Sequence, residues 1–344
     1  MNESLKFTVF SDLHYKKHMY AASIADHLEP IIERAHSSGS DFILHAGDLC
    51  NDYNGSKELT NALLKNKYSL PVYGVYGNHE LETRGNTMEV VTPLLTNRTV
   101  SFGTPDGRFS SEIGYYHFDI KGFRIICSDT NYSQLNGEWV HNLPASWGPP
   151  NGAENQNALS PKQLDWLEST LNDAADKGLK CIVVSHAEFS GKHPGGSSSD
   201  HKAVRELFRR VNSKRKTVVL AINGHYHTDH LFEENGIYYF DCNTVQNGFW
   251  LPSNGQHYAP GQTFDFEDFD GDGNSLGHSK QDLCTLTQSK NTWFFTKPLS
   301  AVITISGNSI IIEGAKTDWT YGIIPEMLRD GKMPCISSHE LRIS

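Results

Sequence analysis

Five groups of acidic, amide and histidine side chains each follow directly on an apolar run of the sequence. They are Asp12 with His14, Asp48, Asn78 with His79, His186, and His225 with His227. Taken singly, each group has an ordinary explanation, because Asp and Asn favour turns and a lone His is usually a hydrogen-bonding residue. Turn preference does not explain why five separate apolar runs all end in residues that bind metals. The combined pattern therefore predicts a metal centre.

The donors are numerous enough for two metal ions that share one carboxylate. Two sets are available: Asp12, His14 and His227 for one ion, and Asn78, His186 and His225 for the other. Asp48 can bridge the ions because its carboxylate has two oxygens. Mixed nitrogen and oxygen donors suit Mn, Fe or Zn better than Mg or Ca. Two such ions, about 3.5 to 4 Å apart, would stabilise the attacking and leaving oxygens of an in-line displacement, with a bridging hydroxide as the nucleophile.

Strands must bring these donors together, because they lie far apart in the sequence. We expect strands over residues 5–11, 41–46, 71–76, 179–185 and 217–222, and helices over residues 19–36 and 56–67. The order strand, helix, strand indicates βαβ units, whose polar strand ends gather at one edge of a sheet. Gly77 stands between an apolar run and Asn78, where it allows the backbone to turn sharply.

The remaining elements follow from local signals. Ser160 caps a helix that begins at Pro161, and a short helix is expected over residues 87–95. Further strands are expected over residues 112–119, 122–128, 237–241, 301–306 and 309–313. Residues 129–158 and 244–298 show no clear periodicity. We interpret them as long loop insertions in a single domain that spans residues 1–344.

Composition limits the classes of function. The chain has 344 residues and a formal net charge of −10, which argues against binding to a nucleic-acid polymer. No apolar run approaches the length of a membrane span, so no membrane association is expected. The dispersed cysteines and the lack of a signal peptide favour the cytoplasm, although a trimmed signal peptide would leave the same start. The oligomeric state is left open.

One acidic segment resembles the start of a calcium-binding loop. Asp268, Asp270 and Asp272 alternate as in the first half of an EF-hand, with Gly273 nearby. The twelfth position, which requires a bidentate Glu, is Ser279. An acidic surface loop is therefore favoured, with a calcium site as the alternative.

The five groups together resemble the motifs of the calcineurin-like metallophosphoesterases, which include purple acid phosphatases and class III cyclic-nucleotide phosphodiesterases. The motifs occur in order as Asp12-Leu13-His14, Gly47-Asp48-Leu49-Cys50-Asn51, Gly77-Asn78-His79-Glu80, Val184-Ser185-His186 and Gly224-His225-Tyr226-His227. The resemblance implies an α/β fold, a four-layer α/β/β/α sandwich with two central mixed β-sheets. It also implies the same ligand set with Asp48 as the bridge.

The resemblance further implies that His79 contacts the phosphate and protonates the leaving alkoxide, which is where a positioned acid helps most. Asn51 and Glu80 replace the Asp residues that are common in the family, but neither position supplies a metal ligand. His186 is followed by Ala187 and Glu188 rather than by the residues usual in phosphodiesterase relatives. This departure weakens any transfer of substrate from those relatives.

The expected substrate is a small phosphate ester, with nucleotide-like esters included. Asn78, His79 and His193 are the candidate substrate contacts, and both phosphomonoesterase and phosphodiesterase activity fit the residues. Two alternatives remain. The chain could be a catalytically inactive binding or scaffold module, which would have no need to keep every ligand. It could also be a protein Ser/Thr phosphatase, for which Arg84 is the arginine nearest to a motif.

Overall fold

The computed structural model describes most of the chain. The described residues are 3–15, 27–50, 53–82, 86–108, 110, 113–142, 152–193, 196–245, 247–248, 263–269, 275–282, 293–318 and 334–343. Within these residues no helix is both long and apolar enough to cross a membrane. The five cysteines whose state is described are free thiols: Cys50, Cys127, Cys181, Cys242 and Cys335.

The first large sheet combines strands from both ends of the chain. Its six strands lie in the order β20-β19-β18-β1-β2-β3. They are β1 (Leu5–Phe10), β2 (Phe42–His45), β3 (Val72–Gly74), β18 (Ala301–Ser306), β19 (Ser309–Glu313) and β20 (His339–Arg342). β1, β2 and β3 run parallel, whereas β18 pairs antiparallel with β1. The sheet is therefore mixed, and its parallel half carries the first three predicted donor groups.

The second large sheet is built from the middle of the chain. Its seven strands lie in the order β12-β13-β11-β10-β6-β5-β4. They are β4 (Ser101–Phe102), β5 (Tyr116–Ile120), β6 (Phe123–Cys127), β10 (Lys180–Val184), β11 (Val218–Asn223), β12 (His230–Glu234) and β13 (Ile237–Asp241). β6, β10, β11 and β13 are parallel, and the strands at both edges are antiparallel.

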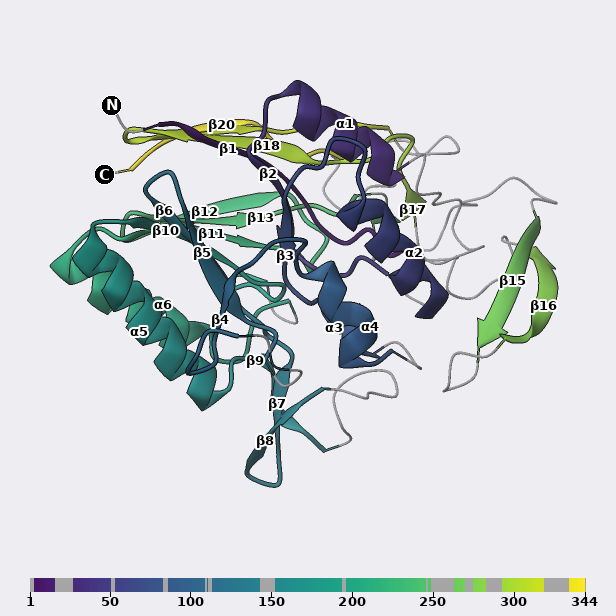
Figure 1. Cartoon of the computed structure of the whole chain (residues 1–344), viewed down its shortest axis with the longest axis horizontal. Helices are drawn as coiled ribbons and strands as arrows, with labels where there is room; N and C mark the ends of the chain where they lie inside the picture. The colour runs from purple at the N-terminus through teal and green to yellow at the C-terminus, as the bar shows by residue number, and fades with distance from the viewer. Residues whose placement is uncertain are drawn as a thin grey trace.

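Helices cover the outer face of each sheet (Figure 1). The helix α1 (Glu29–Ser37) packs on β1 and β2, and α5 (Pro161–Lys177) and α6 (His201–Lys214) pack on β10 and β11. Alternation along β10 shows the layers: Ile182 and Val184 join the core shared with the first sheet, while Cys181 and Val183 join the core under α5 and α6. The predicted α/β/β/α sandwich with two mixed sheets is confirmed.

Local signals at the ends of α5 act as expected. Ser160 Oγ accepts a hydrogen bond from the Gln163 N–H at 3.2 Å, and Pro161 occupies the first turn. Gly178 ends the helix with a φ of 74°, a left-handed conformation that costs glycine little.

The short helices lie near the third strand of the first sheet. They are α2 (Tyr53–Leu64), α3 (Asn78–Glu82), α4 (Met88–Val91) and the 3-10 helix η2 (Thr92–Leu94). α2 packs against α4 and η2. α4 and η2 together occupy the segment where a short helix was predicted.

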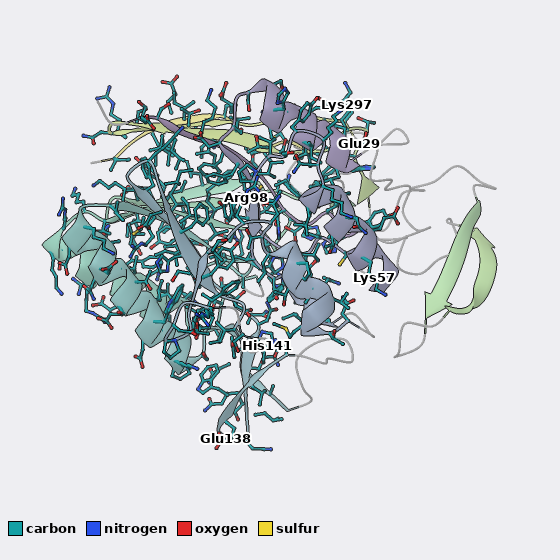
Figure 2. The ribbon with its side chains drawn as sticks, viewed as in Figure 1. Glu29, Lys57, Arg98, Glu138, His141 and Lys297 are labelled. Atoms are coloured by element: carbon teal, nitrogen blue, oxygen red, sulfur yellow. The ribbon has the colours of Figure 1, made fainter. Side chains whose placement is uncertain are left out.

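Part of the segment 129–158, which we interpreted as a loop insertion, forms strands that the sequence does not predict. β7 (Tyr132–Leu135), β8 (Glu138–His141) and β9 (Glu154–Ala158) form a three-stranded antiparallel sheet, which projects from the body in Figure 1. Polar residues dominate these strands, so the apolar alternation that marks a half-buried strand is missing. Figure 2 shows Glu138 on this outlying sheet, where its side chain is exposed, as are those of Glu29 and Lys57 elsewhere.

Residues 244–298 also contain strands that the sequence does not predict. β14 (Asn247–Gly248) pairs with β17 (Trp293–Phe294), and β15 (Thr263–Phe269) pairs with β16 (Ser275–Asp282). Asp270 and Asp272 of the calcium alternative lie outside the described residues, and Asp268 is described only as part of β15. The calcium alternative therefore stays a hypothesis.

Candidate metal centre

The five donor groups follow strands whose carboxyl ends meet between the two sheets. Asp12 and His14 follow β1, Asp48 follows β2, and Asn78 and His79 open α3 after β3. His186 follows β10, while His225 and His227 follow β11. Backbone hydrogen bonds join the loops within each sheet: Asp12 N donates to Gly47 O at 3.0 Å and Gly224 N donates to His186 O at 3.1 Å.

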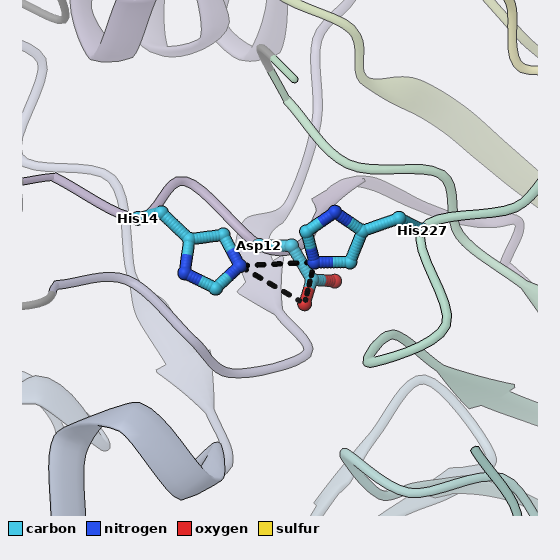
Figure 3. A group of neighbouring side chains, drawn as sticks. All are labelled: Asp12, His14 and His227. Carbon is cyan, nitrogen blue, oxygen red and sulfur yellow. Dashed lines mark hydrogen bonds and ion pairs between the residues drawn. The ribbon is translucent and has the colours of Figure 1, made fainter. Parts of the chain in front are cut away.

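The first set of donors converges from both sheets. His14 Nε2 and His227 Nε2 are 2.9 Å apart, and Asp12 Oδ1 lies 3.2 Å from His227 Nε2 and 3.7 Å from His14 Nε2 (Figure 3). All three side chains are almost completely buried. Three donor atoms this close, with both imidazoles turned toward the carboxylate, form a site that can hold one metal ion.

The second set lies beside the first. His186 Nε2 is 3.1 Å from Asp48 Oδ2, 3.1 Å from His225 Nδ1 and 3.2 Å from Asn78 Oδ1. His186 Nδ1 donates to Ala46 O at 2.7 Å, which leaves the lone pair on Nε2 for a metal. Asn78 Nδ2 donates to Glu82 Oε2, so the amide oxygen is the atom that faces the histidines.

Asp48 lies between the two sets. Its Oδ2 atom is 3.1 Å from His186 Nε2 in one set and 3.8 Å from His14 Nε2 in the other. Its Oδ1 atom accepts the backbone N–H of His79 at 2.8 Å. A carboxylate in this position can contact an ion in either set, as a bridge must.

His79 differs from the other donors in its exposure. Its side chain is 26% exposed, and its Nε2 atom lies 3.9 Å from Asp48 Oδ2. The ring meets His14 edge to face at a centroid distance of 4.8 Å. His79 therefore lies at the accessible rim of the centre.

Five of the donors have a left-handed backbone conformation, which is uncommon outside glycine. The φ values are 55° for Asp12, 48° for His14, 51° for Asp48, 71° for His225 and 51° for His227. Such residues persist only where the surrounding structure holds them, and they cluster at functional sites. The backbone thus turns these side chains inward at an energetic cost.

Glycines let the loops of the centre approach one another. A Cβ atom on Gly77 would lie 2.1 Å from Asp48 Oδ1, and one on Gly224 would lie 1.9 Å from Ser11 Oγ and 2.5 Å from Asp12 Oδ2. No side chain fits at either position without displacing a donor. The two glycines are therefore part of the centre although they carry no donor.

The charges of the centre favour a bound cation. Burial opposes ionisation of Asp12 and Asp48, but the facing histidines outweigh burial and hold the pKa of both carboxyls below the usual range. Burial lowers the pKa of His225 to about 4, so this ring is neutral, as a ligand must be. Asp48 and Asp12 raise the pKa of His186 against the effect of burial. Two buried carboxylates thus require positive charge beside them. The mixed donors fit divalent or trivalent transition metals.

His193 follows His186 closely in the sequence, but its side chain lies in a different group, with Glu188 and Asp241. Its Nδ1 atom lies 3.3 Å from both Glu188 Oε2 and Asp241 Oδ2, and its ring stacks on Tyr226. A role for His193 in substrate binding stays a prediction. The sequence analysis does not predict the pair of His230 and Asp241. The hairpin signal at Asn235 and Gly236 could have indicated that these two residues lie opposite each other. Arg84 lies outside the described residues.

Comparison with known proteins agrees with this architecture. The chain is similar in fold to a dimetal phosphatase from Danio rerio, with 14% identity, a TM-score of 0.59 and 99% of each chain covered. It is also similar to GAP50, described as the anchor in the inner membrane complex of Plasmodium, with 16% identity and a TM-score of 0.51 over 99% of this chain and 89% of that chain. The chain has no match among the curated proteins.

The sequence pattern itself identifies the family. The profile of the calcineurin-like phosphoesterases matches residues 5–229, which hold all five donor groups. The prediction of a metal-dependent phosphoric ester hydrolase is thereby confirmed at the level of the family. This chain belongs to the calcineurin-like phosphoesterase family.

Proposed function

We propose that this protein hydrolyses a small phosphate ester at a dinuclear metal centre, as a phosphomonoesterase or a phosphodiesterase. The observation that carries the proposal is the position of Asp48, whose Oδ2 atom lies within 3.8 Å of a histidine nitrogen in each donor set. A bridging carboxylate between two three-donor sets is the arrangement that a two-metal hydrolase needs.

In this proposal Asp12, His14 and His227 hold one ion, and Asn78, His186 and His225 hold the other. Mn, Fe and Zn suit these mixed donors. When bound, the two ions supply a nucleophile from water at neutral pH and balance the charge of the phosphate. Asp48 keeps the two sets at a fixed separation.

His79 donates the proton that the leaving alkoxide requires. Its Nε2 atom is at the accessible rim, and its backbone N–H is anchored on Asp48 Oδ1. The ring lies where it can face an ester oxygen, while its backbone stays fixed relative to Asp48.

The main alternative is a scaffold of the same fold without activity, because GAP50 is described as an anchor. The complete donor sets and the partly exposed His79 support the hydrolase instead. Arg84, on which the alternative of a protein Ser/Thr phosphatase depends, lies outside the described residues.

Hydrolysis assays on the Mn-loaded protein separate these functions. We expect turnover of p-nitrophenyl phosphate, of bis-p-nitrophenyl phosphate, or of both, and loss of turnover in the presence of a chelator. A protein that binds two Mn ions and hydrolyses neither ester would contradict the hydrolase and support the scaffold.

A further inference from the structure

A second group of donors lies beside the dinuclear centre, and the proposed reaction does not use it. The group comprises His193 from the loop before α6, His230 at the start of β12 and Asp241 at the end of β13. His230 Nδ1 lies 2.9 Å from Asp241 Oδ2, and His193 Nδ1 lies 3.3 Å from the same oxygen. The two rings meet edge to face with their centroids 4.8 Å apart.

The carboxylate of Asp241 is buried and only half used. Its side chain is 2% exposed, and Oδ2 faces both histidines. Asn223 also contributes a hydrogen bond to this carboxylate, whereas Oδ1 is buried without a partner of its own among the described residues. A buried carboxylate oxygen without a partner costs free energy unless a cation compensates it.

Glu188 adds a second negative charge to the group and positions His193. Its Oε1 atom accepts the backbone N–H of His193 at 2.8 Å, and its Oε2 atom lies 3.3 Å from His193 Nδ1. Its side chain is buried, and the hydroxyls of Ser190 and Ser197 donate hydrogen bonds to it. The group therefore has two carboxylates against two imidazoles.

The geometry points to a metal ion rather than to an ordinary pair across strands. His230 and Asp241 are directly opposite in the antiparallel pair of β12 and β13, which explains one of the two contacts. It does not account for His193, which comes from a separate loop and whose Nδ1 lies 3.3 Å from both Asp241 Oδ2 and Glu188 Oε2, between two carboxylates. In tetrahedral zinc sites, bonds of about 2.0 to 2.1 Å place neighbouring donors roughly 3.3 Å apart. The distance from His193 Nδ1 to Asp241 Oδ2 matches this separation.

We propose that His193, His230 and Asp241 form a further metal site for a divalent transition metal such as Zn²⁺. Two imidazole nitrogens and one carboxylate oxygen are a donor set that transition metals favour. The site is separate from the dinuclear centre and does not depend on the proposed hydrolysis.

The position of this site gives it a role in shaping the centre next to it. Tyr226 stacks on His193 with centroids 4.5 Å apart, and it stands in the sequence between His225 and His227. An ion on His193 would fix the ring that supports this segment. The site therefore joins the loop of His193, the β12–β13 hairpin and the two donors on either side of Tyr226.

Zn²⁺ binding to matched variants tests the proposal. His230→Ala removes a ligand that is 35% exposed and should leave the fold intact. Asp241→Asn keeps the size of the side chain and one acceptor oxygen but removes its charge. His339→Ala is the control, because His339 lies on β20 at the edge of the other sheet. After equilibrium dialysis against micromolar Zn²⁺, we expect each ligand variant to hold one Zn²⁺ per chain fewer than the wild type and the control.

A second background separates this site from the dinuclear centre. In an Asp48→Asn protein, His230→Ala should still remove one Zn²⁺ per chain, and Co²⁺ titration should lose one component of the visible absorption. Equal Zn²⁺ content in the wild type, His230→Ala and Asp241→Asn would overturn the proposal and identify the group as a hydrogen-bonded cluster. If the wild type hydrolyses neither ester but still holds one Zn²⁺ per chain more than His230→Ala, only the proposed function is contradicted.

Discussion

Glu80 accepts the backbone N–H of Asp48 on its Oε2 atom at 3.0 Å, and so ties Asp48 to the loop after β3. The same oxygen accepts the Gly77 N–H at 2.7 Å, while Oε1 accepts the N–H groups of Leu49 and Cys50. One buried carboxylate thus receives four backbone donors from two loops. Glu80 is not among the proposed ligands, but it fixes the loops whose side chains form the two donor sets.

The Glu80→Gln substitution should weaken this junction. The NH2 group of the new amide would face backbone N–H groups, and two donors cannot bond to each other. At least one buried backbone N–H would therefore lose its acceptor, at a cost of about 2 kcal/mol. We expect a lower free energy of unfolding in urea and weaker binding of the second ion. Glu340→Gln, at an exposed position on β20, is the control. Equal stability of the two variants would contradict the role of Glu80.

The His79→Ala substitution should separate esters by their leaving groups. Without the acid, hydrolysis of alkyl phosphates should fall by about two to four orders of magnitude, because an alkoxide needs the proton in the transition state. Activated aryl esters should lose far less, and the metal content should stay nearly the same. Steady-state kinetics on both ester classes measure the difference. Equal losses on the two classes would refute the role of His79 as the acid.

The Asp48→Asn substitution should lower the metal content. An amide oxygen carries no charge and cannot bridge two cations as a carboxylate does, so at least one ion should be lost. Elemental analysis of protein purified in the presence of Mn measures the stoichiometry. Asp119→Asn is a useful control, since Asp119 is a carboxylate on β5 that pairs with Arg124 instead. An Asp48→Asn protein with undiminished metal content would refute the bridge.

His45 should make stability depend on pH. Burial lowers its pKa to about 4 from 6.5, and its Nε2 atom donates to Leu94 O at 2.7 Å. The unfolded chain therefore binds a proton between these values that the folded chain does not. The contribution of His45 to the free energy of unfolding is complete above pH 6.5. It is lost as the pH falls toward 4, by up to about 3 kcal/mol.

The His45→Gln variant should remove this part of the pH dependence. Glutamine can still donate to Leu94 O but does not titrate. Urea unfolding of both proteins at several pH values in excess chelator, where metal binding does not contribute, isolates the effect. A wild-type slope equal to the variant slope between pH 4 and 6.5 would show that His45 does not titrate as described.

The sequence predicted the strands that carry the donor groups because each signal is local. An apolar run followed by a donor, as in β2 and Asp48, is visible within about ten residues. Tyr132 and its neighbours on β7 gave no such signal, since their strands are short and polar. The four-layer arrangement followed from the family resemblance of the motifs rather than from the strands themselves.

The group at His230 and Asp241 was missed because its members meet only through strand register. Residues 235 and 236 are Asn and Gly, the strongest short signal for a tight hairpin turn, and both have positive φ. Counting back from that turn pairs His230 with Asp241. His193 could not be added from sequence, because a loop that folds around Glu188 has no periodic pattern.

The left-handed backbone of five donors restricts the amino acids that the centre accepts. Beyond glycine, the residues that tolerate this conformation best are asparagine, aspartate and histidine, and all three can bind a metal. The exchange of one of these side chains for another would alter the charge and softness of the ligand shell with little change in backbone energy. An apolar replacement would lose the donor and strain the chain at once. The backbone therefore favours residues that carry a donor at these five positions, while it leaves the choice among such donors open.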